Sequence, residues 1–171
     1  MDIISHGLWG SIAFGRKNKK SFWTAFLFGI APDFLAFAPL FTLIFLGIYE
    51  RPPISLVEPP DVSLIPLFVY GVYNITHSLF VFAAAFLIIW LIRRRPLWEI
   101  YAWGLHIILD IPTHSYQFFP TPFLWPISDF RIDGIGWASP LIFFPNIAIL
   151  IILYIWFYLI KRISGVAKNF V

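Results

Sequence analysis

Six ionisable side chains lie within or beside apolar stretches of this 171-residue chain, and their types are those of metal ligands. The set includes all four histidines and consists of His6, Asp33, His77, His106, Asp110 and His114. Because the chain has no cysteine, imidazole nitrogens and carboxylate oxygens are the strong ligands that it offers. Such ligands suit Zn²⁺, Mn²⁺ or Fe²⁺. The sequence therefore predicts a site for one or two divalent cations, with Zn²⁺ as the preferred ion.

The spacing of these residues places most of them at a common depth. His106 and Asp110 stand at positions i and i+4, so on a helix they project from one face, about 6 Å apart. The nearest basic residues mark the cytoplasmic edge of the membrane. If the intervening residues are helical, the five groups from His6 to Asp110 lie roughly 15 to 24 Å from that edge. An ionisable group inside a bilayer costs roughly 2.5 to 3.5 kcal/mol and normally has partners there. We therefore predict that this pair meets Asp33 and His77 around one ion, while the remaining histidines complete the site or hold a second ion.

The rest of the sequence is typical of an integral membrane protein. It is 60% hydrophobic and 12% charged, and its mean hydropathy is +0.82. A soluble domain of this size cannot bury about a hundred apolar residues, whereas lipid accepts apolar side chains on the outer surface. The formal net charge of +3 comes from short basic clusters beside apolar runs, a pattern that does not predict nucleic-acid binding. We expect a single domain over residues 1–171, with membrane lipid as its partner.

Four apolar stretches are long enough, or nearly so, to cross a bilayer: 22–48, 64–92, 97–119 and 137–160. Segment 1–14 is too short to cross, at about 21 Å if helical, and is expected to enter the membrane as a half-helix. Prolines interrupt the stretches at Pro32, Pro39, Pro66, Pro112 and Pro140. The sequence thus predicts an all-α integral membrane bundle of four transmembrane helices plus an N-terminal half-helix.

The connections between these stretches alternate in charge. Residues 16–20, 93–95 and 161–162 are basic, whereas 50–61 is acidic and Pro-rich and 112–136 is mixed and aromatic. The positive-inside rule places the basic loops and the C-terminus in the cytoplasm and the two Pro-rich loops outside. Tryptophans near the ends of the stretches are typical of interfacial anchors; they are Trp23, Trp98, Trp137 and Trp156. We therefore expect the chain in the inner, or cytoplasmic, membrane of its cell.

Five short motifs occur in a characteristic order between residues 5 and 126. They are SHGLWG at 5–10, APD at 31–33, THSL at 76–79, GLHIILDIPT at 104–113 and LWP at 124–126. This series resembles the LexA-regulated, membrane-bound metal-dependent hydrolases, a family of small bacterial and archaeal inner-membrane proteins. That family is in turn distantly similar to the zinc-dependent phospholipase C and single-strand nuclease superfamily.

The resemblance implies a phospholipase C-like helical fold with metal-dependent hydrolase activity. By residue type and motif it implies a principal metal held by Asp33, His77, His106 and Asp110, with His6 near a second metal. The sequence departs from the family pattern at two places. Leu35 stands where a second carboxylate usually follows the Pro-Asp pair, and Val-Tyr-Asn at 72–74 replaces the usual His-Arg-Gly.

Hydrolysis is the reaction that this ligand set predicts, because a divalent ion with an open position activates water and polarises a phosphoryl oxygen. We expect cleavage of a phosphoester in a lipid or lipid-linked substrate, with Asp33 or Asp110 as the general base. Arg131 is the only basic residue of the long outer loop and is a candidate contact for the substrate phosphate. Its alternative role is to pair with Asp129 or Asp133.

Other interpretations of the same residues remain open on sequence alone. One is a non-catalytic protein that binds a metal, or transports a metal or protons, through the same ligands. Another is a helical scaffold whose polar residues only hold the bundle together. Thr76, Ser78 and Thr113 are candidate hydrogen-bonding partners of the ligands or of their own backbone. Segment 116–130 is either a lid over the cavity of the predicted metal site or an ordinary loop at the membrane interface.

Overall fold

The computed structural model describes residues 1–51 and 61–163, which contain helices and no β-strand. The α-helices are α1 (Ile3–Phe14), α2 (Lys19–Phe45), α3 (Leu67–Thr76), α4 (Leu79–Arg93), α5 (Tyr101–Thr113) and α6 (Pro140–Ile163). Two 3₁₀ turns, η1 (Val62–Leu64) and η2 (Trp98–Ile100), precede α3 and α5. The predicted all-α class is confirmed. Most of the predicted acidic loop, and the chain after residue 163, lie outside the described residues.

Two helices are long and apolar enough to cross a membrane, namely α2 and α6. The pair α3 and α4 makes a third candidate, but it is bent by 58° between the two helices. The predicted stretch 97–119 contains a shorter helix than expected, because α5 ends at Thr113 and residues 114–119 are not helical. The structure therefore has two candidate spans, or three if the bent pair counts as one, while the short α1 matches the predicted half-helix.

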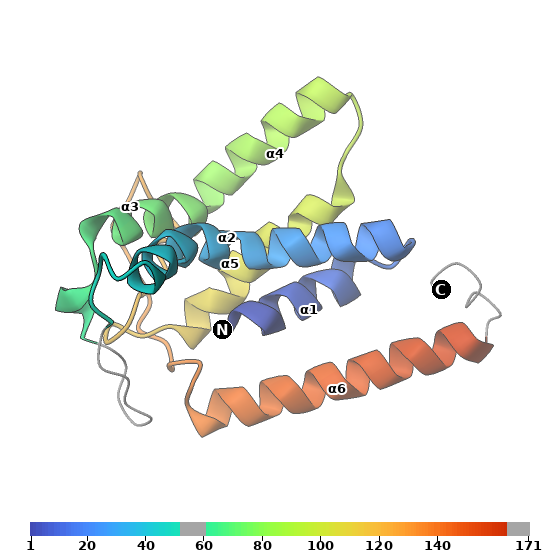
Figure 1. Ribbon diagram of the computed structural model, residues 1–171. Helices are drawn as coiled ribbons and strands as arrows, with labels where there is room; N and C mark the ends of the chain where they lie inside the picture. The colour runs from blue at the N-terminus through green and yellow to red at the C-terminus, as the bar shows by residue number, and fades with distance from the viewer. Residues whose placement is uncertain (52–60, 164–171) are drawn as a thin grey trace.

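The ends of the helices are sorted by charge. In Figure 1, the link between α1 and α2, the link between α4 and α5, and the last turn of α6 all lie at one end of the molecule. Residues 46–51 and 61–66, which lie between α2 and α3, and the loop that follows α5 are found toward the opposite end. The basic clusters at 16–20 and 93–95 therefore share one end, as the alternation of charge in the sequence predicts.

The prolines inside α2 do not break it. Pro32 and Pro39 were expected to interrupt the first apolar stretch, yet α2 continues from Lys19 to Phe45. Proline removes a backbone donor and disturbs the preceding turn, which leaves carbonyl oxygens there in need of partners. Gly29 lies in that turn, and its carbonyl oxygen accepts a hydrogen bond of 2.7 Å from His106 Nδ1. This hydrogen bond joins α5 to the turn of α2 that precedes Pro32.

The break between α3 and α4 occurs at His77 and Ser78, where the sequence has no proline. Ser78 caps α4 by accepting a hydrogen bond from the backbone N–H of Val81. Leu79 N donates to the carbonyl of Phe123, and the indole N–H of Trp103 donates to the carbonyl of Thr76 at 2.7 Å. The polar backbone groups at the break are therefore satisfied inside the protein, which is the condition for irregular backbone at membrane depth.

Helix α1 packs closely against α2 and α5 through small residues. A Cβ atom added to Gly29 would lie 2.5 Å from the carbonyl oxygen of His6 and 3.0 Å from Cα of Gly7. A Cβ atom added to Gly10 would lie 2.7 Å from Cβ of Ala102. Glycines therefore allow these three helices to approach, as small residues do at membrane helix interfaces. This contact holds His6 beside α2 and α5.

Helix α6 lies on the other side of α1 (Figure 1) and is joined to it by polar contacts. Asn146 accepts a hydrogen bond from the indole of Trp9 and donates one to Ser5 Oγ, both at 2.8 Å. Tyr154 donates to the carbonyl of Leu8 at 2.9 Å. Most of the apolar surface of α6 is exposed, as is that of α4. These two helices therefore leave most of their apolar side chains uncovered by the rest of the protein, as helices that face lipid would.

We predict that Gly29→Ala destabilises the protein by about 1 to 3 kcal/mol, because the new methyl group overlaps the backbone of α1. Gly71→Ala is the matched control, since a Cβ atom at Gly71 in α3 meets no atom within 4 Å. Thermal unfolding of both variants in detergent measures the difference. Equal melting temperatures for the two variants would contradict the close packing of α1 on α2.

Candidate metal centre

Four of the predicted ligands converge in the core of the bundle. They are Asp33 from α2, His77 from the break between α3 and α4, and His106 and Asp110 from α5. One ligand atom from each residue lies within 4.8 Å of the other three, and all four residues are buried. The i and i+4 spacing of the α5 pair places both on one face, as the sequence predicts. These residues form a group that could hold a metal ion.

The distances between the four ligand atoms fit a small cation. Bonds of 2.0 to 2.1 Å in a tetrahedron place neighbouring ligand atoms about 3.3 Å apart. His77 Nε2 lies 3.0 Å from His106 Nε2 and 3.3 Å from Asp33 Oδ1. Asp110 Oδ2 lies 3.2 Å from His106 Nε2 and 3.5 Å from His77 Nε2. His106 Nε2 and Asp33 Oδ1 are 3.8 Å apart. These five separations therefore suit a small divalent cation.

The hydrogen bonds of the two histidine rings direct their Nε2 lone pairs into this group. His106 Nδ1 is 2.7 Å from the Gly29 carbonyl, and His77 Nδ1 is 3.1 Å from the Tyr73 carbonyl. A carbonyl oxygen only accepts hydrogen bonds, so each Nδ1 carries the proton and each neutral ring keeps Nε2 free. Two protonated Nε2 atoms would face each other across 3.0 Å. With both rings neutral and protonated on Nδ1, two Nε2 lone pairs face each other, and a metal ion between them would satisfy both.

Buried polar atoms without partners give the same indication. The two ring nitrogens of His6 and the Oδ2 atom of Asp110 make no hydrogen bond, although both residues are fully buried. The distance from His6 Nε2 to Asp110 Oδ1 is only 2.8 Å, but its direction does not suit a hydrogen bond. An unsatisfied buried polar group costs about 1 to 3 kcal/mol. A metal ion bound here would supply a partner for His6 Nε2 and Asp110 Oδ2.

Asp110 connects the four-residue group to the two remaining histidines. Its Oδ2 faces His77 and His106, whereas its Oδ1 faces His6 Nε2 at 2.8 Å and His114 Nε2 at 3.4 Å. The amino group of Met1 also contacts Oδ1 and lies 3.1 Å from His114 Nε2. The structure thus brings all six predicted ligands together, in two groups that share one carboxylate.

Local structure fixes the position of His114 at the end of α5. The residue follows Pro112 and Thr113, and its Nδ1 lies 2.9 Å from the carbonyl of Phe119. Its own carbonyl accepts a hydrogen bond of 2.8 Å from Gly134 N. Residues 114–134 therefore fold back over the end of α5. The ring of His114 is thus held by Phe119, and its backbone is held by Gly134.

Aromatic rings cover two of the ligands. The His6 ring stacks on the His106 ring at 3.6 Å, and the Tyr73 ring stacks on the His77 ring at 3.7 Å. Tyr73 is fully buried and donates a hydrogen bond to the carbonyl of Phe119. The sequence analysis did not identify Tyr73 or the Gly29 carbonyl as parts of the site. Tyr73 lies in α3 four residues before His77, which follows the end of that helix, and this spacing is the signal that could have found it.

The predicted hydrogen-bonding residues have mixed roles. Thr76 Oγ1 lies 3.0 Å from His77 Nδ1, so it contacts a ligand directly. Thr113 donates to the carbonyl of Leu109 at 2.9 Å, and its oxygen is 3.3 Å from the amino group of Met1. Ser78 caps α4 and donates to the carbonyl of Trp125. Thr76 is therefore the member of this set that orients an imidazole.

Two positions singled out in the sequence lie away from the ligand group. Leu35 is 55% exposed on α2, so the residue at the family's second carboxylate position faces outward here. Arg131 forms no ion pair with Asp129 or Asp133 in the part of the chain that the structure describes. Asp133 instead accepts a hydrogen bond from Tyr116 N at 2.8 Å. The predicted contact of Arg131 with a substrate stays a prediction.

Comparison of the chain with models of known protein families, with curated proteins and with solved structures gave no match.

We predict that the purified wild-type protein contains at least one equivalent of a divalent metal, measured by elemental analysis. Asp33→Asn and His106→Ala should weaken metal binding roughly tenfold or more, since each removes a ligand. Asp129→Asn is the matched control, because this exposed carboxylate lies outside the group. Similar low metal content in all four proteins would refute the assignment of the ligands.

A chelator should also destabilise the wild-type protein. At a metal concentration of 100 times the dissociation constant, binding contributes about 2.7 kcal/mol to stability, and a chelator removes that contribution. We expect the melting temperature of the wild type to fall on chelation and to recover with Zn²⁺. The His106→Ala variant should show neither change. A wild type that responds no more than the variant would show that the group needs no cation.

Proposed function

We propose that this chain is a membrane-embedded, metal-dependent hydrolase that cleaves a phosphoester in a lipid or lipid-linked substrate. We further propose that it belongs with the LexA-regulated membrane-bound hydrolases and shares their distant likeness to phospholipase C. The convergence of Asp33, His77, His106 and Asp110 in the core is the observation that carries the proposal. The ordered motifs in the sequence add support, because each of these residues lies in one of them.

A divalent ion held by this group would lower the pKa of water to about 7 and polarise a phosphoryl oxygen. Asp33 is the residue suited to accept a proton from water, because its side chain is 7% exposed whereas those of the other three are fully buried. His77 and His106 are held by backbone carbonyls and serve as fixed ligands. Asp110 Oδ1, His6 and His114 would be the ligands of a second ion, which would have to displace the amino group of Met1 from that oxygen.

An apolar groove beside Asp33 supports a lipid substrate. The groove has a volume of about 360 Å³ and is formed by Ile3 of α1 and by residues of α2 that include Phe34, Phe37 and Phe41. Phe34 follows Asp33 directly in the chain, and Phe37 is one helical turn further on. An acyl chain in this groove would keep its phosphate near the exposed side of the ligand group. The groove has no charged residue in its lining, as an acyl chain requires.

We also propose that the chain crosses the membrane four times, through α2, the bent α3 and α4, α5 and α6. The sorting of the connections supports this topology, because α5 begins at the basic end and is followed by the loop at the opposite end (Figure 1). Non-helical residues after Thr113 would complete that passage within the protein. The basic end would face the cytoplasm and the Pro-rich end the outside of the inner membrane.

We predict metal-dependent release of a phosphorylated headgroup or phosphate when the purified protein is incubated with a panel of phospholipids and lipid-linked phosphates. Asp33→Asn should lower the rate at least about 100-fold even at metal concentrations that restore occupancy, because an amide cannot accept the proton. Asp129→Asn should keep wild-type activity. Mass spectrometry of the products identifies the bond that is cleaved.

Two results would favour the other interpretations of the site. Bound metal with no turnover of any substrate would identify a non-catalytic metal-binding or transporting protein. Metal absent from the wild type, together with a loss of stability in His106→Ala, would identify a polar network that only holds the helices together. Either result would overturn the proposed hydrolase.

A further inference from the structure

A cavity lies at the basic end of the molecule, away from the ligand group. It has a volume of about 600 Å³ and is formed by the start of α2, the end of α4 and the turn that leads into α5. Asp33 is twelve residues beyond Ser21, a lining residue, which places it about 18 Å further along α2. The cavity is therefore separate from the candidate metal centre.

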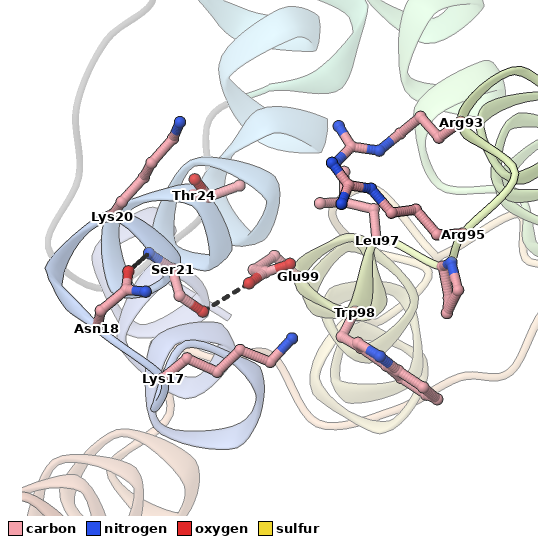
Figure 2. A pocket seen from close by; sticks show the side chains of 11 residues that line it. Lys17, Asn18, Lys20, Ser21, Thr24, Arg93, Arg95, Leu97, Trp98 and Glu99 are labelled. Carbon is pink, nitrogen blue, oxygen red and sulfur yellow. Dashed lines mark hydrogen bonds between the residues drawn. The ribbon is translucent and has the colours of Figure 1, made fainter.

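The lining of this cavity is strongly positive. Four basic side chains line it, Lys17, Lys20, Arg93 and Arg95, against the single carboxylate of Glu99. Figure 2 shows Arg93 and Arg95 reaching toward the opening from one side and Lys17 from the other, with Glu99 between them.

Glu99 does not neutralise these cations. Its carboxylate is buried and accepts a hydrogen bond of 2.6 Å from Ser21 Oγ. Among the residues that the structure describes, none of the four basic side chains forms an ion pair. Asn18 caps α2 at the same place, so the positive end of the helix dipole also points into this region. The cavity therefore lacks an anion that matches its charge.

We propose that this cavity binds the phosphate of an anionic phospholipid headgroup. Phosphate is the anion that paired guanidinium groups recognise best, through two parallel hydrogen bonds from each arginine. A lipid rather than a soluble ligand is favoured by Trp98, which lines the cavity and is half exposed, as an indole at headgroup level would be. Basic pockets between membrane helices are suited to such headgroups.

The neighbouring residue Arg94 provides a matched control. It lies in the same turn as Arg93 and Arg95 and is exposed, but it does not line the cavity. A general attraction of basic turns to an anionic membrane surface would depend on all three arginines equally. A discrete headgroup site would depend on Arg93 and Arg95 and not on Arg94. Each of the three variants, R93Q, R94Q and R95Q, removes one charge from the same turn.

The experiment is a titration of the full-length protein in nonionic detergent with phosphatidylglycerol, followed by native mass spectrometry. We expect saturable binding that phosphatidylcholine does not reproduce. R93Q and R95Q should weaken binding about fivefold or more, and R94Q less than twofold. Metal content and melting temperature, measured on the same samples, establish that each variant is folded.

Three results would overturn the proposal. Equal losses in R93Q, R94Q and R95Q would show that the basic turn acts only as a charged surface. Equal binding of phosphatidylcholine and phosphatidylglycerol would show that the cavity does not select an anion. Displacement of phosphatidylglycerol by equimolar glycerol phosphate would assign the cavity to a soluble phosphate compound, whereas retention of the lipid supports the headgroup site. None of these outcomes depends on hydrolase activity.

Discussion

The arrangement of the core depends on the Asp110 carboxylate, which is buried within a largely apolar protein. A charged group in such a place is stable only with compensating partners, and here histidines approach both of its oxygens. His6 and His114 face one oxygen, whereas His77 and His106 face the other. The helices that carry these rings are consequently held together at one point. A bound cation would give this point its main stabilising interaction.

The packing of the helices also brings the histidines to the Asp110 carboxylate. Glycines bring α1 against α2, so that His6 stacks on His106. The turn before Pro32 supplies the carbonyl that fixes His106, and the break after α3 turns His77 inward. Features that weaken a helix in isolation thus place ligands here, because the freed backbone groups find partners on neighbouring elements. Helices α4 and α6 carry exposed apolar surfaces and have few buried residues.

The sequence predicts which residues converge in the core because ionisable residues in apolar stretches are rare and costly. The i and i+4 spacing of His106 and Asp110, and the shared depth of Asp33 and His77, follow from helical geometry alone. The break at His77 could not be predicted, since it depends on contacts with Phe123 and Trp103, which are distant in the sequence. The length of α5 was overestimated because the expected span was extended past Pro112 to Phe118 and Phe119, which lie in a loop. Pro32 was expected to interrupt a helix that is continuous in the structure.

The central claim is that a cation lies between the imidazoles of His77 and His106. Anomalous diffraction at the zinc absorption edge, from crystals of zinc-loaded protein, tests it most directly. The account predicts a peak about 2.0 to 2.1 Å from Nε2 of both rings and close to the carboxylates of Asp33 and Asp110. Density with no anomalous signal at that point, and with the two rings joined by a hydrogen bond, would contradict it.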